Sequence, residues 1–529
     1  MASRLAATYN LAMRDRDRWV AAGLAVGVAL ALLVPVWIAS LLAPAGTTFA
    51  GFLLNPIDGF SYLAKMRQGL DGSWSFRLPY APEPGAGAFL FPYYLLLGHL
   101  ARLLGADLLV ILYAARTLAA IVMFLAIYRF LEEFIADRAA RWFAYALCLV
   151  GAGWGWLGIP FEFVASDLSI PETTPFLSAY ANAHFPLATA CLLIAGMGVL
   201  GEQPGRPRWI VASLVAGAVL TLVLPFVLLP AVAVLLIGIL VIAVQERRAG
   251  AASSVLRRLL SLGVFLAGSA PWAIYDVWLL WTRPDLAAWN AQNQTPSPAL
   301  GAYSLGFAPL LLLSAIAVVA NREQRRVVYL LLAWVLVQSA LLYSPLALQR
   351  RLSLGLFVPL AALAALGLAA IPRTRWRRIL TILALASAIP SNLIVIAAGL
   401  GGVARAEPLM VQSANESCAL AWLAENADPG SLVLAGETAG NRIPAFANVR
   451  VVYGHPFETP HASEELAQVE RLFAATSDLA LALPVLESRG VDLVYYGPEE
   501  RALGPASWPE ELPAACTCGR VIIARVRTP

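Results

Sequence analysis

The first residues able to do chemistry lie in the segment NPIDGFSYLAKMRQGL, which covers residues 55–70. On a helix, Asp58, Tyr62 and Lys65 would lie on one face, because they stand at positions i, i+4 and i+7. A carboxylate near the start of such a helix can take a proton from the hydroxyl group of an acceptor molecule. Alternatively, Asp58 caps the helix and the other charges form a solvated face.

A second polar stretch, SDLSIPETTPFLSAYANAHF, covers residues 166–185. It contains Asp167 and Glu172, and His184 stands where the next apolar run begins. Paired carboxylates at the face of a membrane can hold a divalent cation or assist a base. The alternative is that both acids belong to turns and that His184 anchors the chain at the interface.

Two adjacent arginines, Arg350 and Arg351, stand in the sequence LQRRLSLGL. They lie at the end of an apolar run that is predicted to face outside, where positive charge is disfavoured. Two guanidinium groups at this level can bind phosphate oxygens bidentately, which predicts a phosphate site. Snorkelling of two interfacial arginines is the alternative.

An amide-rich loop covers residues 283–307 and contains Trp289, Asn290 and Asn293. Amide groups both donate and accept hydrogen bonds, and an indole ring can cover the apolar face of a sugar. The loop therefore suits a hydroxyl-rich ligand, although a polar loop with one interfacial tryptophan would look the same.

Membrane-spanning helices must position these residues. The chain has 529 residues, of which 60% are hydrophobic and 13% charged, and this composition predicts a polytopic α-helical membrane protein. Apolar runs near the ~20 residues needed for a crossing recur from residue 19 to residue 400. The run at 88–104 is short and polar in places, so we interpret it as a re-entrant or interfacial helix, which leaves about eleven crossings. A short true span at 88–104 is the alternative.

Arginine-rich stretches assign the two sides of the membrane. Those at 206–208, 246–248, 321–326 and 373–378 are predicted to be cytoplasmic. The N-terminus is then inside, a first exterior loop covers residues 45–87, and everything after residue 400 is outside. The net charge of +4 is spread over the ends of apolar runs instead of forming one stripe, so nucleic acid is not an expected partner.

The chain divides into a membrane domain, residues 1–402, and a tail, residues 403–529. In the tail, the apolar stretches SLVLAG, VRVVYG, VDLVYYG and RVIIARV predict strands, and residues 416–427, 463–473 and 478–489 predict helices. This alternation predicts a small extracytoplasmic α/β domain.

Two groups of tail residues have more than one interpretation. Cys418 can form a disulfide with Cys516 or Cys518 if the tail is exported. His455, Glu458 and His461 invite a metal site, but their spacing fits no specific zinc pattern, and we favour a structured loop.

The spacing of Asp58, Tyr62, Arg67 and Gly69, followed by SW, LPY and an aromatic-Pro segment, resembles the first exterior loop of GT-C superfamily membrane glycosyltransferases. This group includes protein O-mannosyltransferase-like and lipid A aminoarabinose-transferase-like enzymes. The resemblance implies a polyprenyl-phosphate-linked sugar donor and inverting transfer outside the cytoplasm. It implies that Asp58 is the general base and that Arg350 and Arg351 stabilise the departing lipid phosphate.

The sequence departs from the pattern at Gly59, which follows Asp58 where many relatives carry a second acid. A second carboxylate would have to come from Glu83, Asp71, Asp167 or Glu172. In oligosaccharyltransferase-like relatives, acids of the first two exterior loops bind a metal, so Asp58, Asp167 and Glu172 are candidate ligands of Mg²⁺ or Mn²⁺. Most relatives that use a lipid-monophosphate sugar need no metal, and no cofactor is expected to be required.

The sequence therefore predicts a glycosyltransferase of a bacterial inner membrane that acts on a glycan, lipid or protein acceptor in cell-envelope biosynthesis. Asp58 is the predicted catalytic residue. The predicted substrate contacts are Tyr62, Lys65, Arg67, Glu83, His184, Trp289, Asn290, Asn293, Arg350 and Arg351. Two rival hypotheses are a transporter or flippase of a lipid-linked saccharide, and a non-catalytic assembly protein whose tail carries the function.

Overall fold

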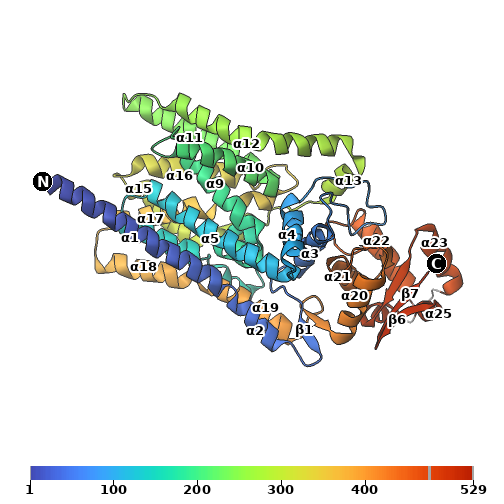
Figure 1. The fold of residues 1–529 in the computed structure, drawn as a ribbon. Helices are drawn as coiled ribbons and strands as arrows, with labels where there is room; N and C mark the ends of the chain where they lie inside the picture. Colours follow the sequence, from blue (N-terminus) through green and yellow to red (C-terminus); the bar gives the residue numbers. More distant parts are fainter. Residues whose placement is uncertain (1, 475–477, 505, 527–529) are drawn as a thin grey trace. The chain divides into compact units, whose positions relative to one another are not determined.

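A computed structural model describes residues 2–474, 478–504 and 506–526 (Figure 1). The chain forms two compact units, and each is described by itself. Unit 1 comprises Met1–Val34, Ala115–Val277 and Thr295–Ala398; unit 2 comprises Pro35–Ala114, Trp278–Gln294 and Gly399–Pro529. The predicted first exterior loop, residues 45–87, thus belongs to the same unit as the tail, although the sequence assigned it to the membrane domain.

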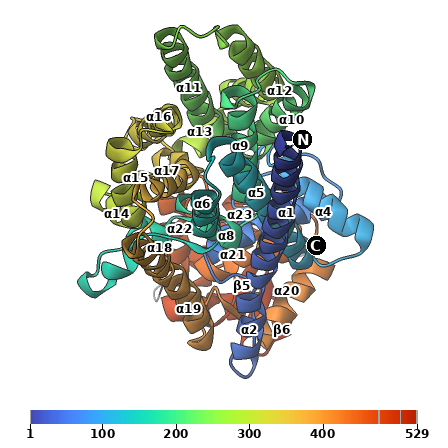
Figure 2. The same ribbon diagram turned by 90° about the vertical axis from the view of Figure 1, so that its left-hand side faces the viewer.

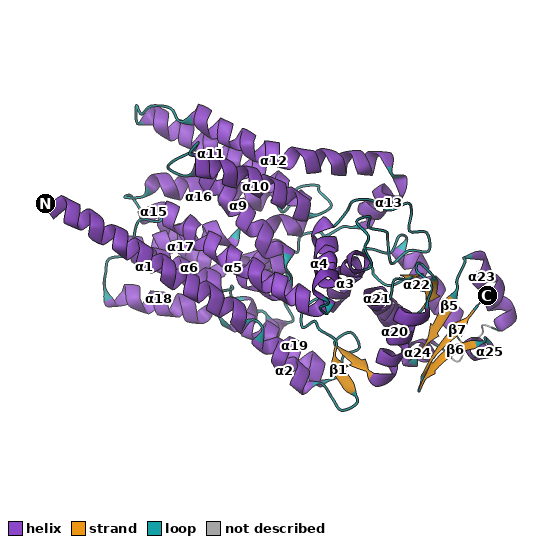
Figure 3. Cartoon of the chain, viewed as in Figure 1, coloured by secondary structure: helices purple, strands orange, loops and turns teal. Residues whose placement is uncertain are grey.

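Unit 1 is built from helices, and its described residues form no strand (Figure 3). The main helices, three of which continue into unit 2, are α1 (Ala2–Ala31), α5 (Leu108–Phe134), α6 (Arg138–Val150), α8 (Pro175–Ala181), α9 (His184–Leu200), α10 (Pro207–Val223), α11 (Leu228–Arg248), α12 (Val255–Thr282), α14 (Leu300–Gly306), α15 (Ala308–Ala320), α16 (Arg325–Leu341), α17 (Phe357–Ala370), α18 (Arg375–Ser387) and α19 (Pro390–Ala404). Helix α17 is buried along most of its length and lies beside α15 and α16 (Figure 2). Gly367 lets the backbones of α17 and α15 approach closely, because a Cβ there would overlap the carbonyl group of Leu313.

Five helical stretches in the described part of the chain are long and apolar enough to cross a membrane, or up to seven if each of two bent pairs is one span. Helix α12 also exposes large apolar side chains such as Leu256, Leu260 and Ile274, which suit contact with lipid. The prediction of a polytopic helical membrane protein is confirmed. The count of about eleven crossings stays a prediction, because several of the expected spans are shorter apolar helices such as α9, α10 and α17.

In unit 2, helix α3 (Pro56–Leu70) packs against helix α4 (Pro92–Leu104). Gly69 and Gly98 are at this crossing, where a Cβ on either would overlap the backbone of the other helix. Helix α4 has 13 residues, or about 20 Å, which is less than the hydrocarbon thickness of a bilayer. The interpretation of the run at 88–104 as a re-entrant or interfacial helix stays a prediction, and the shortness of α4 favours it. The other elements of this region are α2 (Val34–Leu42), β1 (Thr47–Phe49) and α13 (Pro284–Gln292).

The tail in unit 2 contains a five-stranded mixed sheet with the order β4-β3-β5-β7-β6. Strand β3 is parallel to β4 and β5, and β7 is antiparallel to β5 and β6. The strands are β3 (Leu432–Leu434), β4 (Arg450–Val451), β5 (Leu493–Tyr496), β6 (Ala514–Cys518) and β7 (Val521–Arg525), and β2 (Val411–Ser413) pairs separately with β1. Their helices are α20 (Ala414–Asn426), α21 (Glu437–Phe446), α22 (Ala462–Phe473), α23 (Leu479–Ser488), α24 (Pro498–Leu503) and α25 (Trp508–Glu511).

Both faces of this sheet are covered. Along β5, Leu493 and Tyr495 face one apolar cluster, and Val494 and Tyr496 face another. Helices α20 and α21 contribute to the first cluster, and α22, α23 and α25 contribute to the second. The predicted combination of helices and strands in the tail is confirmed as a mixed sheet covered by helices, and a Cys418–Cys518 disulfide joins α20 to β6. The chain therefore makes one of the two pairings that the sequence left open. The separate extracytoplasmic domain stays a prediction.

Candidate active site

Helix α3 places Asp58 in its first turn, next to Pro56 at the helix start. A carboxylate is favoured there by the unpaired N–H groups and the helix dipole. The Asp58 side chain is 43% exposed, so it can reach a molecule that arrives from solvent. The helix expected to carry Asp58, Tyr62 and Lys65 is present as Pro56–Leu70. Its N-cap is Asn55, so Asp58 lies in the first turn and does not cap the helix.

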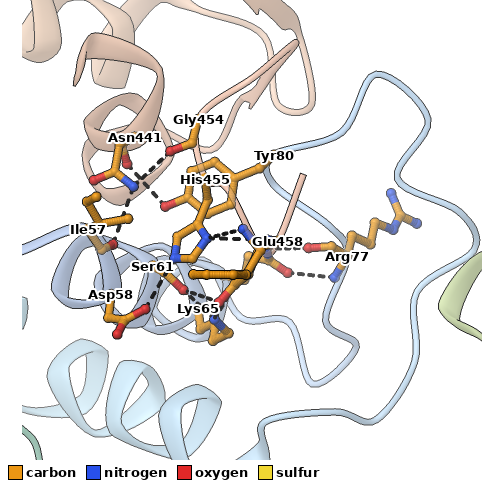
Figure 4. Close-up of polar contacts among 12 residues, drawn as sticks. Ile57, Asp58, Ser61, Lys65, Arg77, Tyr80, Asn441, Gly454, His455 and Glu458 are labelled. Carbon is orange, nitrogen blue, oxygen red and sulfur yellow. Dashed lines mark hydrogen bonds and ion pairs between the residues drawn. The ribbon is translucent and has the colours of Figure 1, made fainter. Parts of the chain in front are cut away.

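His455, which comes from the loop after β4, contacts Asp58 (Figure 4). Nε2 of His455 lies 3.3 Å from Oδ1 of Asp58, and the imidazole is only 2% exposed. Nδ1 of the same ring accepts hydrogen bonds from the backbone N–H groups of Phe457 at 3.1 Å and Glu458 at 3.2 Å. Because Nδ1 is an acceptor, the ring proton is on Nε2 and is donated to Asp58.

A buried ion pair fixes the same loop to α3 two helical turns further along. Nζ of Lys65 lies 2.7 Å and 2.9 Å from the two carboxylate oxygens of Glu458, and the hydroxyl of Ser61 donates to Glu458 at 2.6 Å. Burial acts to raise the pKa of Glu458, but the charges of Lys65 and His455 and the hydrogen bonds outweigh it, so the pKa lies below its ordinary value. The Glu458 carboxylate is thus ionised, and Lys65 and Ser61 bind it within the protein.

Aromatic rings surround the Lys65 ammonium group. It lies 4.5 Å from the centroid of Phe91 and 5.8 Å from those of Tyr62 and Phe76. Electron-rich ring faces attract a cation and compensate part of the cost of taking it out of water. Lys65 is the only lysine of the chain, and with 2% of its side chain exposed it has a structural role in this arrangement.

Asn441 of α21 holds the start of α3 and the His455 loop together. Its side-chain amide donates to the carbonyl groups of Gly454 at 2.9 Å and Ile57 at 3.3 Å. The Tyr80 hydroxyl donates to the backbone carbonyl of Asn441 at 3.1 Å. Three segments far apart in sequence therefore fix the geometry of Asp58 and His455 (Figure 4).

The structure places the other predicted contacts of unit 2 in varied surroundings. Tyr62 stacks on Tyr94 with ring centroids 4.7 Å apart, and Arg67 pairs with Asp71 at 3.4 Å. Trp289 is buried in an apolar cluster, so protein side chains cover its ring. Its predicted sugar contact, and those of the exposed Glu83 and Asn290 and the half-buried Asn293, stay predictions.

In unit 1, Asp167 and Glu172 are buried. Oδ2 of Asp167 accepts from the backbone N–H groups of Gly153 at 2.9 Å and Gly155 at 3.2 Å. Burial raises the pKa of Asp167, and these hydrogen bonds oppose the rise. The carboxylate thus anchors a turn, as in the alternative interpretation of this stretch. His184 is also buried, with its ring against Phe185.

No group of three metal-binding side chains occurs among the residues that the structure describes. Asp58 belongs to unit 2, whereas Asp167 and Glu172 belong to unit 1. The predicted Mg²⁺ or Mn²⁺ site stays untested. Two members of the candidate metal group in the tail, His455, Glu458 and His461, have protein partners instead: His455 contacts Asp58, and Glu458 contacts Lys65.

Arg350 and Arg351 lie in a short 3₁₀ helix, Gln349–Ser353, of unit 1. The backbone N–H of Arg350 donates to the carbonyl of Thr295 at 3.1 Å, while its Nε is buried without a hydrogen-bond partner. The guanidinium of Arg351 lies 5.6 Å from the ring centroid of Phe226. Neither guanidinium forms an ion pair with a carboxylate in the described parts of the chain, which leaves both charges available to an anion.

Sequence reasoning singled out Asp58 as a candidate but missed its contact with His455. The two residues are 397 positions apart, and no spacing rule joins them. The only signal was the concentration of histidine and acid in GHPFETPHASEE, which suggested a metal site instead.

Comparisons with known proteins support the architecture. No protein-family model and no curated protein sequence matches the chain. Its fold is similar to that of ArnT, an aminoarabinose transferase from Cupriavidus metallidurans, in the apo state, with a TM-score of 0.57 and 13% identity over 94% of this chain and 97% of ArnT. The structure of ArnT bound to undecaprenyl phosphate gives a TM-score of 0.54, 13% identity and coverages of 94% and 98%.

The arabinofuranosyltransferase AftD from Mycobacteria is also similar, with a TM-score of 0.54 and 16% identity. That match covers 97% of this chain but only 40% of AftD. These neighbours are GT-C glycosyltransferases, so the chain has the GT-C fold that the first exterior segment suggested.

Proposed function

We propose that this chain with a GT-C fold is a membrane glycosyltransferase that moves a sugar from a polyprenyl-phosphate donor to an acceptor hydroxyl. The observation that carries the proposal is the Asp58–His455 pair, a half-exposed carboxylate held by a buried imidazole at the start of α3. The fold shared with ArnT and AftD supports the enzyme class.

In the proposed reaction, Asp58 takes the proton of the acceptor hydroxyl as its oxygen attacks the anomeric carbon. The bond between that carbon and the donor phosphate breaks, the phosphate leaves with the electron pair, and the anomeric configuration inverts. His455 donates its Nε2–H to Asp58 and holds the carboxylate in one orientation. Its Nδ1 is occupied by two backbone N–H groups, so His455 acts as a fixed donor and not as the base.

Arg350 and Arg351 are proposed to bind the donor phosphate. Their guanidinium groups carry no carboxylate partner in the described residues, and arginine binds phosphate oxygens bidentately. Undecaprenyl phosphate is bound in one ArnT structure, which supports a lipid-phosphate donor here.

The proposed location is a bacterial inner membrane, with about eleven crossings, a cytoplasmic N-terminus and the tail outside. The arginine-rich stretches support this orientation. The Cys418–Cys518 disulfide also supports it, because disulfides persist in oxidising compartments.

The test compares Asp58→Asn with the wild type in membranes supplied with a panel of radiolabelled polyprenyl-phosphate sugars. Sugar transfer should fall at least a hundredfold, since general-base catalysis contributes roughly 10²–10⁴-fold. Glu425→Gln, an exposed carboxyl-to-amide change in the tail, is the matched control and should keep full activity. Wild-type transfer by correctly inserted Asp58→Asn protein would remove Asp58 from the role of base.

A further inference from the structure

Unit 2 contains a second polar site, a cleft of about 550 Å³. Its walls are the C-terminal half of α3, the loop after α3, and tail segments near residues 429–430 and 444–450. The volume lies in the range of sites that bind small molecules. The cleft is distinct from the Asp58–His455 pair, because neither residue lines it.

The cleft carries excess positive charge. Arg67, Arg77 and Arg450 line it, and among its described lining residues Asp71 is the only acid. Asp71 lies 3.4 Å from Arg67, so the charges of Arg77 and Arg450 have no counter-charge among those lining residues.

The Arg450 guanidinium is held in place by neutral groups. Its Nε donates to the carbonyl of Gly430 at 2.9 Å, and another nitrogen donates to the carbonyl of Pro82. Burial lowers the pKa of Arg450, Asp492 opposes this shift, and Arg77 adds to it by repulsion. Arg77 and Arg450 both line the cleft, so an anion that enters it would be attracted by both guanidinium groups.

Arg77 is presented by a rigid piece of backbone. The side chain of Gln68 on α3 accepts from the Arg77 N–H at 2.9 Å and donates to the Arg77 carbonyl at 2.8 Å. The guanidinium is exposed and points away from the Asp58–His455 pair (Figure 4). The backbone of Arg77 is therefore fixed at the wall of the cleft, while its side chain is exposed and can be changed without disturbing a buried contact.

We infer that this cleft binds an anionic saccharide segment of the acceptor, at a distance from the hydroxyl group that reacts. The acceptor role rests on the proposed function; the binding of an anionic saccharide does not. The anionic groups would meet the guanidiniums, and the sugar hydroxyls would meet polar groups of Ser73, Ser75 and Asn448. Carboxylate and phosphate substituents share this chemistry.

Helix geometry separates the cleft from the reaction centre. Arg67 lies nine residues after Asp58, which is about 14 Å along α3 and half a turn around it. An acceptor that reaches both sites must therefore be several sugar units long. Contacts at such a distance should lower the KM for the acceptor and leave kcat nearly unchanged.

The binding test uses the full-length protein in nanodiscs of zwitterionic phospholipid and three probes of similar length: an oligogalacturonate, a phosphorylated oligomannoside and neutral maltohexaose. We expect one or both anionic probes to bind at least tenfold more tightly than maltohexaose, and added salt to weaken this binding. Arg77→Glu should reduce anionic binding at least tenfold. Arg520→Glu, the same charge change in the exposed turn between β6 and β7, is the matched control and should bind like the wild type.

Equal binding of all three probes, or anionic binding that survives Arg77→Glu, would overturn the inference. Asp58→Asn protein should keep the binding, which separates the two proposals. If Arg77-dependent binding occurs and no sugar donor is used, the proposed enzyme fails while the anion site stands. If sugar transfer depends on Asp58 but the charged and neutral probes bind equally, only the inference about the cleft fails.

Discussion

Substitution of His455 tests whether the tail positions Asp58, the proposed base. The asparagine variant, His455→Asn, should keep an acceptor near the position of Nδ1 and so preserve the turn formed with the N–H groups of Phe457 and Glu458. Its shorter side chain lacks the donor that contacts Asp58. The glutamine variant is the complement, because its amide can reach Asp58 while the turn loses its acceptor.

The expected size of the effect follows from the contact. A hydrogen bond to a charged group contributes about 1.5–3 kcal/mol. The 3.3 Å separation between His455 and Asp58 exceeds the ~2.8 Å of a strong charge-assisted bond, and Asp58 is 43% exposed, so the lower end applies. A loss of about 1.4 kcal/mol lowers kcat/KM roughly tenfold.

The assay is kcat/KM for sugar transfer across pH, together with thermal unfolding of each variant. His455→Asn should lose about tenfold in kcat/KM with little change in melting temperature, because its turn is kept. The acid limb of its pH profile should move to higher pH, because the ionised form of Asp58 loses a donor. His455→Gln should keep more activity but melt earlier. Wild-type kinetics and an unmoved pH profile in His455→Asn would refute the positioning role.

Four further outcomes are expected. Lys65→Met should destabilise the protein by about 3–5 kcal/mol, because it leaves the Glu458 carboxylate buried without its partner, and adding Glu458→Gln should restore most of the loss in chemical denaturation. The lowered pKa of Glu458 stabilises the fold at neutral pH, and this contribution should disappear as the pH falls below its ordinary value of 4.5. Glu500 should behave in the opposite way, because burial and the charge of Glu499 raise its pKa to about 7. The stability of the fold should therefore fall as the pH rises from 4.5 to 7, and Glu500→Gln should flatten that slope. Changing both Arg350 and Arg351 to Ala should raise the KM for the lipid-phosphate donor about tenfold or more without changing that for the acceptor, and an unchanged donor KM would exclude them from the phosphate site.

Local sequence patterns predicted much of the tail. VDLVYYG and RVIIARV became β5 and β7 because each is a short apolar run that the sheet buries from both faces. Strand β6 was missed, since Ala514–Cys518 is a half-exposed edge strand with little apolar signal. Helix α21 was missed as well, because Gly440 and Pro444 are poor helix residues that tertiary packing tolerates.

The candidate site was predictable only in part. Asp58 stands in a local pattern that a single segment reveals. Lys65 has the same helical spacing, and its charge suggested a substrate contact, but the structure assigns it to Glu458 across 393 positions. Such pairings depend on which loop of the tail packs against α3, and neither periodicity nor composition carries that information.

The arrangement of charges explains how the His455 loop finds its register on α3. The helix presents an acid, Asp58, and two turns later a cation, Lys65; the loop presents His455 and then Glu458. In the observed register each helix group meets a loop group of complementary chemistry. If the loop were reversed on the helix, Glu458 would face Asp58 and His455 would face Lys65, which would bring two carboxylates together and leave a buried ammonium group without its counter-charge. A buried ion pair adds little net stability compared with apolar side chains, so its value here is that it disfavours the reversed register. If Asp58 is the base, as proposed, its orientation then depends on Glu458, to which no hydrogen bond or ion pair of Asp58 is directed among those described.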